Sequence, residues 1–333
     1  MNSLSEENNI RTHYLKISRQ ASFQISLKPL DQEDFRVLNK NNRTLSLNQF
    51  LDNFNAPAVL RQDIASEIDV DLDRPLEGFF TCGVLDQLKE NSSFRNFYEE
   101  NRNEQKTAFN AYISSFGTSI KKNGMTVVDI GWGGTMQESL YQYFNREVAI
   151  TGLYLGLKEI YTITEDTKRY GLNFSIYPST KFDDHVLKAN GQLYEQLAAA
   201  PHGCTIGYSN DPKNPTAEYH EEREKYVYDN YVKEIQTYMR KEINTLSSSL
   251  KYVDYTKKMT QDYLVKLALK TGLFMNRPKL KFIQQISKGF FQNIGDNKVG
   301  LNYKSKALPL SKKNHFHYFA LNTRKTLSLF CEN

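Results

Sequence analysis

The sequence contains few cysteines, and this scarcity excludes two classes of small cross-linked protein. Its 333 residues include three cysteines, Cys82, Cys204 and Cys331, which are far apart and odd in number. Such a set fits neither a disulfide framework nor a structural zinc site. We therefore expect reduced thiols and no protein-held metal centre.

Long hydrophobic runs are also absent. The longest apolar stretch, residues 148–157, is too short to span a bilayer and is expected to be a buried strand. Residues 1–12 are polar and acidic without an apolar core, so we expect a disordered N-terminus and no signal peptide. The sequence thus predicts a cytoplasmic protein.

Acidic residues are scarce at the C-terminal end. Residues 301–333 hold six lysines and arginines against the single acid Glu332, so this basic tail contributes 6 − 1 = +5, the whole net charge. The tail is either a solvated basic end or a surface attracted to anionic lipid or to a phosphate-bearing acceptor. We expect at most peripheral contact with the inner face of the cell membrane. His315 and His317 are expected to be surface residues of this tail, and nothing resembles a nucleic-acid-binding module.

The composition favours a large hydrophobic core. Hydrophobic residues make up 39% of the chain and aromatic residues 13%, and the length suggests one large or two moderate domains. We expect an α/β domain over residues 13–210, a helical region over 217–300 and the basic tail over 301–333. Helical patterns cover residues 45–54, 56–68, 92–116, 184–200, 217–250 and 260–275. Strand patterns cover residues 13–17, 125–129, 148–157, 170–177 and 204–208.

The chain is organised around residues 125–137, Met-Thr-Val-Val-Asp-Ile-Gly-Trp-Gly-Gly-Thr-Met-Gln. Residues 125–128 favour a short buried strand, which Asp129 closes. Gly131, Gly133 and Gly134 then form a turn, followed by Thr135 and a helix over residues 137–144. With the strand at 148–157, this makes a βαβ unit of a parallel sheet.

A strand, an acid, a glycine turn and a helix together are typical of a phosphate or nucleotide site. Glycines let the backbone approach a ligand, and the first N–H groups of a helix attract anions. Thr135 is expected to cap the helix and to bond the same anion. Asp129 lies where open α/β sheets bind ligands and could accept hydrogen bonds from sugar hydroxyls. The alternative is a tight turn without a ligand.

The motif resembles two families. Residues 127–129 (Val-Val-Asp) and 133–135 (Gly-Gly-Thr) are similar to the signature of the type I phosphoribosyltransferases, in which the acid binds the ribose hydroxyls of phosphoribosyl pyrophosphate and the loop binds its 5-phosphate. That family usually has a second acid where this chain has Ile130. Asp129, Gly131 and Gly133 also match the first motif of the Rossmann-like methyltransferases, with Glu159 as the ribose-binding acid, but Thr135 replaces the third glycine.

A wider set of segments resembles a family from bacterial capsule and O-antigen gene clusters. These are residues 14–19 (Tyr-Leu-Lys-Ile-Ser-Arg), 128–137, 152–156 (Gly-Leu-Tyr-Leu-Gly), 200–203 (Ala-Pro-His-Gly) and 207–208 (Gly-Tyr). In that family a HAD-like phosphatase domain often precedes a phosphoribosyltransferase-like domain. The resemblance implies a type I phosphoribosyltransferase-like parallel sheet with flanking helices, and a C-terminal helical region.

Two segments of that family have no counterpart here. The chain has no phosphatase Asp-x-Asp motif, so we expect no phosphatase activity and a separate HAD-type phosphatase as a partner. It also lacks the Leu-Ala-Arg-Asp-Gly-like loop that holds pyrophosphate. We therefore expect a truncated member, a partner chain that supplies the loop, or a site that works differently.

The resemblance implies glycosyl transfer at C1 of a ribosyl donor to a glycan, which could be lipid-linked. Mg²⁺ would neutralise the leaving pyrophosphate. Asp129 would fix the ribose, the turn from Gly131 to Thr135 would hold the 5-phosphate, and Arg19 would pair with a phosphate oxygen. His202 is a candidate general base, or a structural histidine. Trp132, between two glycines, is expected to face the ligand. The alternatives are an S-adenosylmethionine-dependent methyltransferase and a non-catalytic binding subunit.

Overall fold

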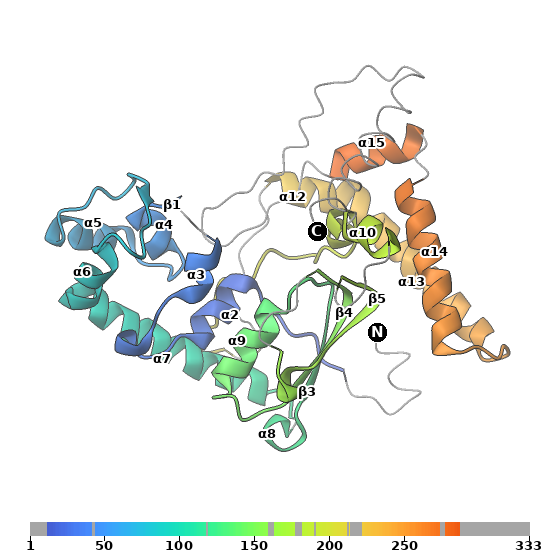
Figure 1. The fold of residues 1–333 in the computed structure, drawn as a ribbon, viewed down its shortest axis with the longest axis horizontal. Helices are drawn as coiled ribbons and strands as arrows, with labels where there is room; N and C mark the ends of the chain where they lie inside the picture. The colour runs from blue at the N-terminus through green and yellow to red at the C-terminus, as the bar shows by residue number, and fades with distance from the viewer. Residues whose placement is uncertain are drawn as a thin grey trace.

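A computed structural model describes residues 12–41, 44–117, 119–158, 163–176, 182–189, 191–211, 213, 222–273 and 277–286. Within them the chain is a mixed α/β protein with a three-stranded parallel sheet flanked by helices (Figure 1). The basic tail, Glu159, His315 and His317 lie outside the described residues.

The sheet lies in the middle of the chain. It contains β3 (Met125–Asp129), β4 (Ile150–Leu157) and β5 (Arg169–Ser175), in the order β3-β4-β5. Both pairs are parallel, with Asp129 opposite Tyr154 and Leu153 opposite Tyr170. Helix α9 (Thr135–Tyr143) connects β3 to β4, which confirms the predicted βαβ unit.

β3 is an edge strand and none of its residues is buried, so the expectation of a buried strand is wrong. Met125 and Val127 pack against a core cluster that includes residues of α9, whereas the alternate residue Val128 is 61% exposed. Alternation of this kind shows that only one face of the strand is covered. The apolar run over residues 125–128 therefore does not mark a strand covered on both faces.

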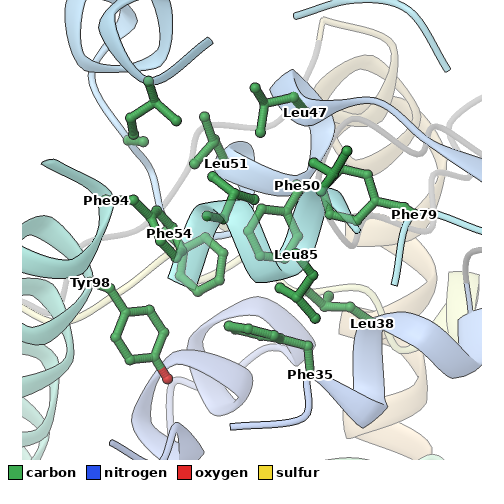
Figure 2. Close-up of a cluster of buried hydrophobic side chains, with 14 of the residues drawn as sticks. Phe35, Leu38, Leu47, Phe50, Leu51, Phe54, Phe79, Leu85, Phe94 and Tyr98 are labelled. Atoms are coloured by element: carbon green, nitrogen blue, oxygen red, sulfur yellow. The ribbon is translucent and has the colours of Figure 1, made fainter. Parts of the chain in front are cut away.

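A mostly helical lobe precedes the sheet and has its own aromatic core. Its elements are α2 (Arg19–Ser26), the 3₁₀ helix η1 (Leu30–Gln32), α3 (Arg36–Asn41), α4 (Leu47–Asp52), α5 (Ala58–Glu67), α6 (Val84–Glu90) and α7 (Ser92–Ser114), with a small antiparallel pair of β1 (Thr44–Leu45) and β2 (Leu76–Glu77). Phe35, Phe50, Phe54, Phe79 and Phe94 contact one another at its centre (Figure 2). The α/β character expected for residues 13–210 is therefore confined to the later part of that range.

Helix α7 connects the lobe to the sheet. Its first half contributes Phe94 and Tyr98 to the aromatic core, and its second half contributes Phe109 and Tyr112 to the cluster beneath β3 and β4. The Asn91 side chain caps its start by accepting a hydrogen bond from the backbone N–H of Phe94. The long helix predicted over residues 92–116 is confirmed.

Residues 13–17 and 204–208 do not form the two predicted strands. Tyrosine hydroxyls satisfy the backbone instead, since Tyr112 Oη accepts from the Lys16 N–H at 2.9 Å and Tyr208 Oη donates to the Lys16 carbonyl at 3.0 Å. Only Thr205 makes an isolated bridge in the second segment. Side chains from other segments therefore hold the backbone of these two stretches.

The remaining elements are mostly helices. They are α8 (Ile120–Asn123), the 3₁₀ helix η2 (Glu165–Thr167), α10 (Phe182–Ala189), α11 (Gly191–Leu197), α12 (Glu222–Val227), the π-helical η3 (Tyr228–Val232), α13 (Lys233–Leu250), α14 (Lys257–Leu273) and α15 (Arg277–Ile286). The helix expected over residues 184–200 is thus α10 and α11. Among the described residues, no helix combines the length and apolar character that a membrane crossing requires.

Candidate functional site

The glycine turn leaves the C-terminal end of β3 and runs beside β4. The Ile130 carbonyl accepts a hydrogen bond from the Gly156 N–H, and the Trp132 carbonyl accepts one from the Lys158 N–H at 2.9 Å. Gly131 has φ = 152°, and a Cβ there would lie 2.8 Å from the Gly156 carbonyl oxygen. Glycine is therefore required at this position by backbone conformation and by close approach.

The turn ends at Gly134, from which α9 starts. Gly134 is the N-cap residue in the left-handed conformation, with φ = 73°, and no side chain caps the helix. Thr135 is the exposed first residue of α9, so the expectation that it caps the helix is wrong. The first N–H groups of a helix have no intrahelical partner, and here they carry the positive end of the helix dipole. This arrangement suits an anion.

The buried side chain of Arg169, the first residue of β5, supports the turn. Its side chain is 1% exposed, and its Nη1 donates to the Gly133 carbonyl at 2.8 Å. An ion pair with Glu138 on α9, at 3.6 Å, compensates its charge. Burial lowers the pKa of Arg169, and the nearby Tyr154 and Glu138 oppose that effect. The sequence motif did not identify this arginine, because a strand arginine normally indicates a solvent-exposed face.

A buried glutamine completes the support of the turn. Gln137 is 1% exposed; its Nε2 donates to the Ile150 carbonyl at 2.6 Å, and its Oε1 accepts from Tyr154 Oη at 2.9 Å and from Arg169 Nε at 3.3 Å. Buried polar groups that satisfy one another in this way specify one local arrangement. Gln137 thus links α9 to β4 and β5.

Asp129 lies at the mouth of the turn. Its carboxylate accepts hydrogen bonds from the backbone N–H groups of Ile130, at 2.7 Å, and Gly131. Burial raises the pKa of Asp129, while these hydrogen bonds and the positive charge of Arg19 favour the ionised form and Glu195 disfavours it. The predicted site residues Asp129 and Arg19 are therefore close enough for their charges to attract each other.

Arg19 is exposed and is the first residue of α2. Ser18 caps this helix, accepting from the Ala21 N–H at 3.1 Å, and its hydroxyl donates to the Thr205 carbonyl. The guanidinium is thus carried by a helix start that is fixed to the segment after His202. Its exposure leaves the guanidinium accessible to an anionic ligand.

The expectation that Trp132 faces the ligand is wrong, because the side chain is buried and packs against β5. Its ring is 8% exposed and stacks on Phe174 with 5.7 Å between centroids. The indole Nε1 donates to Glu195, and Lys158 Nζ lies 4.0 Å from the ring centroid. The tryptophan is therefore a packing anchor that connects the turn to β5 and α11.

His202 is held by its own surroundings. Its Nδ1 lies 2.7 Å from the Gly203 carbonyl, which can only accept, so this nitrogen carries a proton. Its Nε2 lies 2.9 Å from Tyr14 Oη, and the two rings pack edge to face. Among the described residues, the hydrogen-bond and ring partners of His202 are Tyr14 and Gly203, and Asp129 is not one of them.

The described residues contain no cluster of three or more histidine, cysteine, aspartate or glutamate side chains arranged to hold a metal ion. A search against models of known protein families finds no match for this chain, and a search of curated proteins finds no significant relative.

Proposed function

We propose that this protein transfers a 5-phosphoribosyl group from phosphoribosyl pyrophosphate to a glycan acceptor during the synthesis of a cell-surface polysaccharide. One observation carries the proposal: Asp129 closes β3 next to a glycine turn that opens into the uncapped start of α9. Such an acid and such a helix start suit a ligand that carries both a vicinal diol and a phosphate.

The 5-phosphate is assigned to the start of α9. The left-handed Gly134 is the N-cap of α9, no side chain caps the first N–H groups of the helix, and the exposed Thr135 is its first residue. Arg169 keeps this backbone in position through the Gly133 carbonyl. Backbone donors fixed in advance bind a phosphate without further ordering of the loop.

The ribose is assigned to Asp129 and the pyrophosphate to Arg19. The Asp129 carboxylate would accept hydrogen bonds from the 2- and 3-hydroxyl groups, which compensate for its burial. The exposed guanidinium of Arg19 would pair with phosphate oxygens in a bidentate manner. Mg²⁺, which prefers oxygen ligands and substrate phosphates, would neutralise the leaving group. Asp129 would supply carboxylate oxygens for such an ion, directly or through water.

In the transfer step the bond from C1 to pyrophosphate breaks, and an acceptor hydroxyl oxygen bonds to C1 from the opposite face. The hydroxyl proton leaves to a base, and Nε2 of His202 is the candidate, since Nδ1 already carries a proton. Tyr14 Oη occupies Nε2, so the acceptor hydroxyl must displace the tyrosine or pass its proton through it. A separate HAD-type phosphatase would then remove the 5-phosphate.

The test is calorimetric titration of the full chain with phosphoribosyl pyrophosphate and Mg²⁺, beside S-adenosylmethionine. The variant is Asp129→Asn, which keeps the side-chain shape, and the matched control is Asp63→Asn on an exposed position of α5. Losing hydrogen bonds to a charged acceptor costs about 1.5–3 kcal/mol, so binding should weaken about 10- to 150-fold in the first variant only.

Binding of S-adenosylmethionine in place of the ribosyl donor would overturn the proposal in favour of methyl transfer. Equal affinity of Asp129→Asn and wild type for the donor would show that Asp129 does not bind the ribose. If neither ligand binds wild type, the proposed donor site is refuted for this chain.

A further inference from the structure

Helices α13 and α14, with the turn over residues 251–256, form a segment that we term the hairpin. None of the residues of α13 is buried, and the turn lies at the edge of the molecule in the view of Figure 1. A surface helix normally buries one apolar face. Packing within the protein therefore does not explain the apolar residues of α13.

The hairpin exposes many large apolar side chains. Along α13, Tyr238, Met239, Ile243 and Leu246 recur at helical spacing. The turn and α14 add further ones. Exposed fractions are 63% for Tyr238, 42% for Met239, 48% for Ile243, 54% for Leu246, 89% for Tyr252, 56% for Val253, 51% for Tyr255, 60% for Met259 and 60% for Tyr263. Apolar groups gathered in this way mark an interaction surface.

Helix α14 has two apolar faces, and folding explains only one. Its inner face packs Val265, Ala268 and Leu269 against the cluster of Trp132 and Phe174, and Gln261 Nε2 donates to the Leu172 carbonyl of β5 at 2.8 Å. Its outer face carries Met259, Tyr263 and Leu267 at four-residue steps, with Leu267 43% exposed. The inner face anchors the hairpin to the protein, and the outer face is available to a partner.

The turn and α14 carry a net positive charge. Residues 251–270 contain five lysines, at positions 251, 257, 258, 266 and 270, and two acids, at 254 and 262, so the net charge is 5 − 2 = +3. Lys266 and Lys270 follow Tyr263 by three and seven residues and so share its side of the helix. Aromatic and apolar groups bordered by lysines match the interface of an anionic bilayer.

We propose that the hairpin docks onto an anionic membrane surface, with Tyr252 and Tyr263 at the level of the headgroups and the lysines on lipid phosphates. A second copy of this chain suits the surface less well, because lysine is depleted at protein interfaces and like charges would face one another. The inference does not require the donor site. It adds a reason why a lipid-linked acceptor would be close to the protein, and it assigns the contact to the hairpin rather than to the basic tail.

The test is co-sedimentation of the full chain with phosphatidylcholine vesicles that contain or lack phosphatidylglycerol. Each lysine near an anionic surface contributes about fivefold to binding, so Lys257→Gln with Lys258→Gln should weaken binding ~25-fold. The matched control is Lys121→Gln with Lys122→Gln, an exposed neighbouring pair on α8 that removes the same charge. Tyr252→Ser with Tyr263→Ser should also reduce binding, although it changes no charge.

The proposal predicts binding only to the anionic vesicles, weakened by added salt and by both hairpin variants and not by the α8 control. Equal losses in the hairpin and α8 lysine variants would show unspecific charge attraction and overturn it, as would full binding by the hairpin variants. An absence of vesicle binding together with a dimer that the tyrosine variant dissociates in analytical ultracentrifugation would assign the surface to a second copy. Donor titration of the same variants keeps this outcome separate from failure of the donor site.

Discussion

Gly134 and Gly83 provide a matched pair of substitutions that measures how tightly the glycine turn is held. Both are left-handed N-cap residues, at the start of α9 with φ = 73° and of α6 with φ = 87°. A Cβ on Gly83 would meet no atom within 4 Å, whereas one on Gly134 would lie 2.6 Å from Nε of the buried Arg169. The two alanine variants therefore share the backbone cost and differ in the contact with Arg169.

The expected costs follow from these two contributions. A left-handed alanine costs roughly 1–2 kcal/mol, which is the whole effect expected for Gly83→Ala. At Gly134 overpacking adds about 1–3 kcal/mol, because Arg169 cannot move away without losing its bond to the Gly133 carbonyl. We therefore expect Gly134→Ala to reduce the free energy of unfolding by about 2–5 kcal/mol.

Urea unfolding measures both variants, with far-ultraviolet circular dichroism reporting on the helices and the fluorescence of the single tryptophan, Trp132, reporting on the turn. The larger loss should be visible by both probes for Gly134→Ala. Equal losses for the two variants would refute the inference that Arg169 packs rigidly behind the turn.

Three further predictions concern the core, the acid and the extended N-terminal segment. Phe50→Ala, in the centre of the aromatic core, should cost about 3–5 kcal/mol in urea unfolding, whereas Val59→Ala, at a site 71% exposed, should change stability by less than about 0.5 kcal/mol. Burial raises the pKa of Asp129, so the contribution of this carboxyl group to stability is present below pH ~4 and is lost as pH rises through the folded pKa. Asp129→Asn should therefore gain stability over wild type as pH rises from ~4 to ~7, measured as the difference between their urea midpoints. A difference that stays constant with pH would contradict the burial of this acid. Tyr112→Phe leaves the Lys16 N–H without its hydroxyl partner and should cost about 1–3 kcal/mol in thermal unfolding, unlike Tyr238→Phe, which alters a side chain 63% exposed.

The central βαβ unit could be predicted from the sequence because its signals are local. Apolar strands of the right length flank an amphipathic helix, and three glycines and an acid lie between the first strand and that helix. The structure places β3, α9 and β4 as this pattern predicts, with Leu140 and Phe144 in the core beneath the sheet.

The environment of individual side chains could not be predicted in the same way. Trp132 stands between two glycines, which suggests exposure, yet Phe174 and Glu195, far away in sequence, bury its ring. Arg169 and Gln137 are polar residues at buried positions, and only the fold shows that they satisfy each other. Long-range contacts decide these cases, and sequence periodicity contains no information on them.

Isolated segments were also ambiguous. Residues 13–17 alternate apolar and polar side chains as a strand does, but the Tyr112 and Tyr208 hydroxyls take the hydrogen bonds that a neighbouring strand would supply. The aromatic core of the helical lobe could not be predicted from the sequence either, because each of its short helices contributes only a few rings. Local patterns identified several of these helices without identifying their common core.

The central claim, that the turn from Gly131 to Thr135 binds the phosphate of a ribosyl ligand, is tested most directly by fluorine NMR of protein carrying 5-fluorotryptophan. The chain has one tryptophan, within the turn itself, so a single resonance reports on the site. The account predicts that ribose 5-phosphate and phosphoribosyl pyrophosphate with Mg²⁺ shift this resonance, that ribose does not, and that Asp129→Asn weakens the response while Asp63→Asn leaves it intact. A resonance unaffected by either phosphate ligand at saturating concentration would contradict it.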